Sequence, residues 1–181
     1  MKTVVVYKSK TGFTKKYAKY ISEALDCHLY DYKSSKNINL DDYDVVIYGG
    51  SLYASGILGL KKFKTRIKNQ ELIVFAVGAT PPKEGLDDEI INANFNEEVR
   101  KKISFFYMRG GFDYNSLNLI DKGLMKMMKR SILKKDPKER TADEKGMLNA
   151  FNNPVDFTNR KKVQPLVDYI RKVSSNEKNV N

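Results

Sequence analysis

The sequence has one cysteine, one histidine and no long apolar run. Its single thiol excludes an internal disulfide and any metal or iron–sulfur site built from several cysteines, which favours a reducing compartment. No stretch reaches the roughly eighteen apolar residues of a membrane-spanning helix, and Met1 leads directly into a strand pattern rather than a signal peptide. We therefore expect a cytoplasmic protein that binds no metal.

Cys27 and His28 stand next to each other at the predicted junction of a helix and a strand. A catalytic nucleophile and its base normally converge from separate parts of a chain. The pair therefore indicates a small packed cysteine, and we predict no catalytic side chain from the sequence.

Acidic residues are scarce relative to basic ones: 33 Lys and Arg against 22 Asp and Glu give a net charge of +11. This balance favours acidic partners or surfaces. A general lysine bias of the source organism would give the same total, so both interpretations stay open. The charge comes without a helix-turn-helix, zinc-finger or aromatic RNA-binding motif, so we expect no nucleic-acid partner.

A phosphate-binding turn is predicted near the N-terminus. The buried strand pattern at 4–6 breaks into a turn rich in hydroxyl groups, and a helical pattern begins near Thr14, so unpaired N–H groups would face the turn. Ser9 and Thr11 add hydroxyl donors, and Gly12 permits close approach of a ligand to the backbone. Neither Gly-x-Gly-x-x-Gly nor Gly-Lys-Ser/Thr is present. An ordinary turn between a strand and a helix is the alternative.

Strand and helix patterns alternate along the rest of the chain. Such alternation predicts one α/β domain with a parallel sheet covered on both faces, and 181 residues suit a single core. The predicted strands cover 3–7, 28–32, 44–49, 72–78 and 104–109, and the predicted helices cover 14–25, 58–68, 88–101, 117–134 and 159–173.

Two further loops look specialised. Residues 49–56, after the third strand, are rich in glycine and carry Leu52 and Tyr53, which could cover a flat ring. Residues 78–82, after the fourth strand, combine small residues with prolines. Because ligands of open parallel sheets bind outside the carboxyl ends of the strands, we expect both loops to meet the phosphate turn.

The hydroxyl-rich turn around Thr11-Gly12 resembles the phosphate loop of the flavodoxin family, which holds the phosphate of FMN. The resemblance implies a flavodoxin-like three-layer sandwich with a five-stranded parallel sheet in the order 2-1-3-4-5 and an insertion after the fifth strand. It also implies FMN as the cofactor. The contacts it implies are Ser9, Lys10, Thr11, Gly12, Phe13 and Thr14 for the phosphate, and Ser51, Leu52, Tyr53, Ala54, Gly78, Ala79 and Thr80 for the ring.

The predicted domain covers 1–174, with the insertion at about 112–157 and a disordered tail at 175–181. Within the insertion, residues 117–135 form a basic amphipathic helix. Its apolar side carries Leu117, Ile120, Leu124, Met127 and Met128, and its basic side carries Lys122, Lys126, Lys129 and Arg130. Such a helix either lies peripherally on an anionic membrane or packs its apolar side on its own domain.

Residues 109–129, followed by Lys-Glu-Arg-Thr at 138–141, resemble the insertion of the flavodoxin-type, quinone-dependent protoporphyrinogen oxidases. We expect an FMN-binding redox protein, either an electron carrier or an FMN-dependent oxidoreductase, with a redox protein or a quinone as its partner. The alternatives are a protoporphyrinogen IX oxidase of haem biosynthesis and a flavin-free interaction domain. A net positive chain would also raise the potential of its flavin by favouring the reduced anion.

Overall fold

A computed structural model describes residues 1–53 and 55–178. The chain divides into two compact units. The core unit comprises Met1–Gly110 together with the chain from Thr158 on, and the insertion unit comprises Gly111–Phe157.

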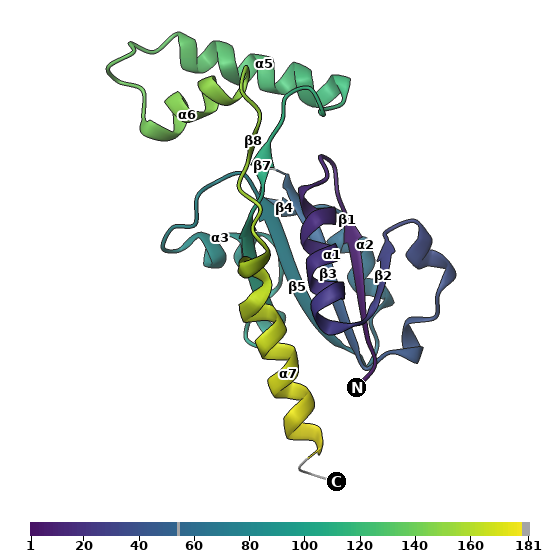
Figure 1. Cartoon of the computed structure of the whole chain (residues 1–181). Helices are drawn as coiled ribbons and strands as arrows, with labels where there is room; N and C mark the ends of the chain where they lie inside the picture. The colour runs from purple at the N-terminus through teal and green to yellow at the C-terminus, as the bar shows by residue number, and fades with distance from the viewer. Residues whose placement is uncertain (54, 179–181) are drawn as a thin grey trace. The chain divides into compact units, whose positions relative to one another are not determined.

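The core unit is built on a parallel sheet in the order β2-β1-β3-β5-β6 (Figure 1). A two-residue strand, β4, pairs antiparallel with the end of β3. Because β4 takes a number of its own, this is the order 2-1-3-4-5 predicted for the five main strands, and the flavodoxin-like fold is confirmed. The strands are β1 (Thr3–Lys8), β2 (His28–Asp31), β3 (Val45–Tyr53), β4 (Gly56–Ile57), β5 (Glu71–Gly78) and β6 (Ser104–Arg109).

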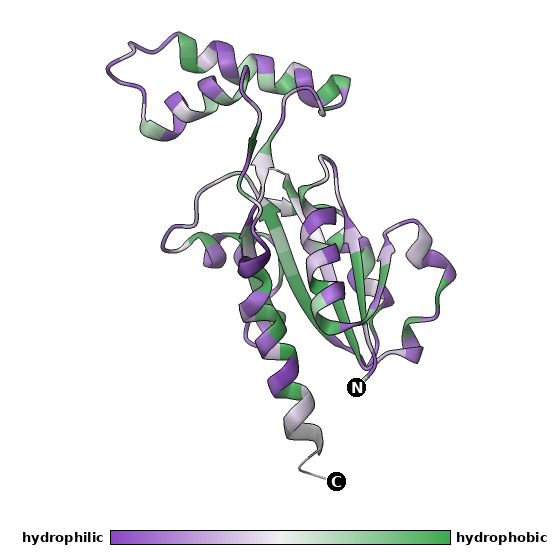
Figure 2. Cartoon of the chain, in the orientation of Figure 1, coloured by the Kyte–Doolittle hydropathy of each residue, from purple (hydrophilic) through white to green (hydrophobic). Residues whose placement is uncertain are grey.

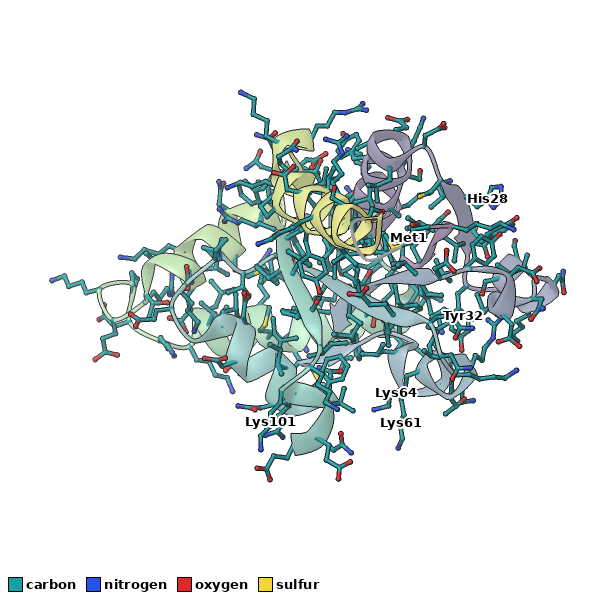
Figure 3. All side chains as sticks on the ribbon, turned by 90° about the horizontal axis from the view of Figure 1, so that it is seen from below. Met1, His28, Tyr32, Lys61, Lys64 and Lys101 are labelled. Carbon is teal, nitrogen blue, oxygen red and sulfur yellow. The ribbon has the colours of Figure 1, made fainter. Side chains whose placement is uncertain are left out.

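Helices cover both faces of this sheet (Figures 1 and 3). One face is covered by α1 and α7, and the other by α2 and α3. The helices of the core unit are α1 (Phe13–Leu25), α2 (Leu60–Phe63), α3 (Leu86–Asn94), α4 (Glu97–Arg100) and α7 (Gln164–Lys178), with 3₁₀ turns at Ser34–Asn37, Leu40–Asp42, Lys64–Arg66 and Arg160–Val163.

The central strands are apolar on both sides because both sides are covered. Val4 and Val6 pack towards α2 and α3, while Val5 packs towards α1 and α7, and all three are fully buried. Successive side chains of a strand point to opposite faces of the sheet. A continuous β-branched run therefore contributes buried side chains to the apolar core on each face. Figure 2 shows this apolar character most clearly along β5.

Two predicted helices are shorter than expected. The helix predicted at 58–68 begins only at Leu60, because Gly59 has a φ of 84°, and it gives way to a 3₁₀ turn at Lys64. The helix predicted at 88–101 is two helices, α3 and α4, because the backbone is extended at Phe95, whose side chain is buried, and at Asn96, which caps α4.

The predicted glycine-rich loop at 49–56 is mostly strand, which corrects the prediction. β3 continues to Tyr53 and pairs with β5 as far as Ser51. The glycines serve close packing: a Cβ on Gly49 would overlap the Phe75 ring, and a Cβ on Gly50 would overlap the side chain of Ile57. Glycine is therefore required at positions 49 and 50 by neighbours on the sheet, and the backbone turns only after Tyr53, where β4 pairs antiparallel with β3.

The C-terminal helix also runs further than predicted. We expected it at 159–173 with a disordered tail at 175–181, whereas α7 begins at Gln164 and ends at Lys178. Its start is anchored by Leu166 and Val167, which are buried. Once the first turn of a helix has formed, each further residue adds a hydrogen bond at a small cost in free energy. No glycine or proline interrupts the end of α7, so the helix continues beyond the predicted end. Positions 179–181 lie outside the described residues.

The insertion unit holds two helices and a short strand pair. α5 (Leu119–Leu133) is the predicted basic helix, and α6 (Ala142–Ala150) was not predicted. β7 (Gly111–Phe112) and β8 (Val155–Asp156) pair antiparallel. Phe151 contacts the rings of Phe112 and Tyr114, so the unit has its own aromatic cluster. In the part of the chain that the structure describes, no helix is both long and apolar enough to cross a bilayer.

We predict that Gly49→Ala lowers the free energy of unfolding by about 1–3 kcal/mol, because the added methyl group overpacks the space filled by Phe75. Urea unfolding followed by circular dichroism measures the loss. The double variant Gly49→Ala/Phe75→Leu should lose less than the sum of the two single losses, since the smaller side chain makes room. Additive losses would contradict the packing explanation. The control Gly123→Ala, where a Cβ meets nothing, should not destabilise the protein.

Candidate functional site

The turn between β1 and α1 presents the N-terminus of α1 without any negative charge. Gly12 occupies the N-cap position with a φ of 90°, and it offers no side chain to cap the helix. The first turn of α1 carries no acidic residue. By contrast, Asp87, Asp88 and Glu89 occupy the first turn of α3. The N–H groups and the positive end of the α1 dipole therefore remain available to an external anion.

Space for that anion exists at Gly12. A Cβ built on this residue would meet nothing within 4 Å, and the left-handed backbone favours glycine. Ser9 Oγ accepts a hydrogen bond of 3.0 Å from the Gly12 N–H, which holds the turn closed on itself. Thr11 is half-buried in the same turn and adds a hydroxyl group. The predicted phosphate turn thus has the shape and the donors of an anion cradle.

Ser51 joins this turn to the end of β3. Its Oγ lies 2.9 Å from Thr14 Oγ1 and accepts a hydrogen bond of 3.3 Å from the Lys10 N–H. Lys10 Nζ in turn lies 3.8 Å from the ring centroid of Tyr53, whose side chain is exposed. The structure therefore brings the predicted phosphate residues and the predicted ring residues of β3 together. Leu52 lies beside them on β3, and Ala54 lies outside the described residues.

The third predicted segment, Gly78 to Thr80, is held by β6. Tyr107 donates its hydroxyl to the Thr80 carbonyl at 2.7 Å, and Arg109 Nε donates to the Ala79 carbonyl at 3.2 Å. The Gly110 N–H also donates to the Gly78 carbonyl at 2.7 Å. These contacts fix the course of the segment at the carboxyl edge of the sheet.

Tyr107 and Arg109 were not predicted as site residues. Burial raises the pKa of Tyr107 to about 12, with the nearby Arg109 charge opposing the rise, so its hydroxyl remains a proton donor at neutral pH. One signal was present in the sequence: both residues lie at the carboxyl end of the last parallel strand, where ligands of such sheets bind.

The chemistry of the site is that of anion and ring binding. Its donors are backbone N–H groups, hydroxyl groups and the Lys10 ammonium, and Tyr53 offers an exposed aromatic face. The residues therefore fit a phosphate bearing a flat ring. Within residues 1–53 and 55–178, no group of three or more His, Cys, Asp or Glu could hold a metal ion.

Cys27 and His28 do not form a catalytic pair. His28 Nδ1 lies 2.8 Å from the hydroxyl of Tyr43, and His28 stands on the edge strand of the sheet (Figure 3). Burial raises the pKa of Cys27 to about 11, and the negative charge of Asp26 adds to the rise. At neutral pH the thiol is therefore protonated and a poor nucleophile.

Comparison with known proteins places this chain among flavodoxin folds. A family described as "Flavodoxin domain" matches residues 4–141. Comparison with curated proteins found no significant match.

Three solved structures illustrate the likeness. Flavodoxin 2 from Bacillus cereus shares 20% identity over 60% of this chain and 84% of its own, with a TM-score of 0.43. A flavoprotein in complex with FMN from Lactobacillus acidophilus shares 19% identity over 60% of this chain and 91% of its own, with a TM-score of 0.41. A flavodoxin, WrbA-like protein from Agrobacterium tumefaciens shares 17% identity over 66% of this chain and 87% of its own, with a TM-score of 0.38.

We predict that Cys27 in the folded protein reacts slowly with iodoacetamide and that its rate rises about tenfold per pH unit from about pH 7 to about pH 10, because only the thiolate reacts. In urea the same thiol should react faster, and its rate should level off near the ordinary cysteine pKa of about 8.5. A folded-state rate that levels off below about pH 9 would contradict the raised pKa.

Proposed function

Because the chain belongs to the flavodoxin domain family, we propose that it binds FMN at the carboxyl edge of the core-unit sheet and acts as an FMN-dependent redox protein. The observation that carries this proposal is the uncapped, acid-free N-terminus of α1 behind Gly12, with open space before it. A phosphate dianion satisfies the N–H groups and the dipole of such a terminus.

Each part of the site has a separate task in this proposal. The first turn of α1 and the Thr11 hydroxyl bind the phosphate, while Ser51 keeps that turn in register with β3. Tyr53 covers one face of the ring, and the segment from Gly78 to Thr80 forms a wall at its edge. Bound FMN supplies the electron chemistry, and the protein orients the ring and sets its potential.

Lys10 gives the site a local positive charge. Its ammonium lies over Tyr53, and none of the predicted contact residues carries a carboxylate. A cation near the ring stabilises the reduced, negatively charged flavin more than the oxidised one, by about 0.4 kcal/mol for one charge at about 10 Å in water-like dielectric. We therefore infer a potential above that of an otherwise identical site without the cation, which suits exchange of electrons with a quinone or a redox protein.

Two alternatives from the sequence are weaker. A flavin-free interaction domain would have no need of an uncapped helix terminus joined to an exposed aromatic ring. The resemblance of residues 109–129 to the protoporphyrinogen oxidases stays a prediction, because the family match describes only a flavodoxin domain. We propose no porphyrinogen substrate.

We predict that the purified protein binds FMN and that Thr11→Val weakens FMN binding about tenfold or more, because a hydrogen bond to a charged group is worth about 1.5–3 kcal/mol. Quenching of FMN fluorescence measures both affinities. Riboflavin, which lacks the phosphate, should bind Thr11→Val and the natural protein equally.

The matched control is Thr65→Val, an exposed threonine whose hydroxyl bonds only the nearby Lys62 carbonyl. This variant should bind FMN like the natural protein. Equal loss of FMN and riboflavin in Thr11→Val would show general damage to the site. Failure of the natural protein to bind FMN at all would overturn the proposed function in favour of an interaction domain.

We predict that Lys10→Gln lowers the midpoint potential of bound FMN, while Lys10→Arg leaves it nearly unchanged, because the effect depends on the charge at this position. A dithionite titration against a reference dye measures the potentials. Added salt should shrink the difference between the natural protein and Lys10→Gln. Lys172→Gln, on the exposed side of α7, is the control and should not shift the potential; an equal shift there would mean that only total charge matters.

A further inference from the structure

Exposed apolar side chains concentrate on α5. The described residues include nine large hydrophobic side chains that are exposed, and five of them lie on this one helix. Leu119 is 87% exposed, Ile120 is 75% exposed and Met127 is 63% exposed; Leu124 and Leu133 are the other two. A single exposed leucine is ordinary, but a group on one short helix indicates a contact surface.

The packing of the insertion unit does not use these side chains. α5 turns Asp121 and Ile132 inward, where they are 5% and 7% exposed. The aromatic cluster of the unit is also reached from α5, since Lys129 Nζ lies 4.8 Å from the ring centroid of Phe151. The strip formed by Ile120, Leu124 and Met127, spaced by four and three residues, lies on another side of the helix.

A row of cations runs beside this apolar strip. Lys126, Arg130 and Lys134 follow one another at intervals of four residues, so they line up along the helix, and all three are exposed. None of them forms an ion pair within the described chain, whereas the neighbouring Lys135 pairs with Glu144. The only acidic residue of α5 is the buried Asp121. Figure 2 shows the alternation of apolar and polar residues along α5.

We propose that α5 is a membrane-surface helix that lies on an anionic bilayer. The strip of Ile120, Leu124 and Met127 enters the boundary between headgroups and acyl chains, and the row of Lys126, Arg130 and Lys134 contacts lipid phosphates. An apolar strip beside a row of cations without carboxylate partners matches the two layers of such a surface, apolar below and anionic above. The net charge of +11 adds attraction at longer range.

Sedimentation of the full-length protein with vesicles tests the proposal. The protein should bind phosphatidylcholine vesicles that contain phosphatidylglycerol, should bind pure phosphatidylcholine vesicles far more weakly, and should be released by salt. Replacing Lys126, Arg130 and Lys134 by Gln should lower binding about fivefold per charge. Ile120→Ser/Met127→Ser should lower it about tenfold or more at unchanged charge.

Matched controls separate the surface from total charge and from exposed apolar residues elsewhere. Replacing Lys61, Lys62 and Lys172 by Gln removes the same charge from the core unit, and Val99→Ser removes an exposed apolar side chain there. Both controls should keep most of the vesicle binding. FMN binding and circular dichroism check that every variant is folded, and because all the substituted side chains are exposed, folding should be preserved.

Three outcomes would overturn the proposal. The first is no binding to anionic vesicles at low salt. The second is an equal loss of vesicle binding in the α5 charge variant and in the charge-matched control, which would show that binding depends only on the net charge of the protein. The third is a concentration-dependent dimer that Ile120→Ser/Met127→Ser abolishes and vesicles do not compete with, which would show that a second copy of this chain covers the strip.

Discussion

The close packing of the Phe75 and Ile57 side chains against the two glycines of β3 is the constraint on which the site depends. Because Gly49 has no side chain, the Phe75 ring packs directly against the backbone of β3. The side chain of Ile57 packs against the backbone at Gly50 for the same reason. β3 therefore stays paired with β1 as far as Gly50 and with β5 as far as Ser51. That extension carries Ser51 to the edge where it meets Thr14 and the Lys10 backbone. A larger residue at either glycine would move the serine and disconnect the two halves of the site.

The positive potential at the carboxyl edge of the sheet follows from the absence of a side-chain cap and of acidic residues at the N-terminus of α1. Several other helices of this chain complete their own N-termini: α6 has a capping box between Thr141 and Glu144, and α4 is capped by Asn96. The four-residue α2 also begins behind an uncapped glycine, but the side chains of Tyr48 and Lys8 fill the space at Gly59. α1 has a glycine at that position and no acid in its first turn. The positive end of the α1 dipole therefore has no negative partner in its own turn. A bound anion would accept hydrogen bonds from the N–H groups and interact favourably with the dipole, which is the physical reason for assigning the phosphate here.

Sequence patterns predicted what depends on local periodicity and missed what depends on distant neighbours. The parallel sheet of β-branched strands followed from alternation with helices, its strand order was implied by the resemblance to the flavodoxin family, and the anion turn followed from Ser9, Thr11 and Gly12. The role of Gly49 could not be predicted, because only the fold brings Phe75 against it. Tyr107 and Arg109 were missed for the same reason: their bonds to Ala79 and Thr80 cross from one strand to the next. α6 was missed although its capping box is visible in the sequence, because its apolar periodicity is weak.

The packing inside the insertion unit leaves the apolar strip of α5 without a partner in that unit. The unit closes on Phe151, which contacts the rings of Phe112 and Tyr114, while Ile120 and Met127 stay exposed. Side chains that do not pack inside their own unit expose apolar surface to water at a cost in solubility. Their placement beside a row of cations is then accounted for by a contact outside the chain, and an anionic bilayer satisfies both the strip and the row at once.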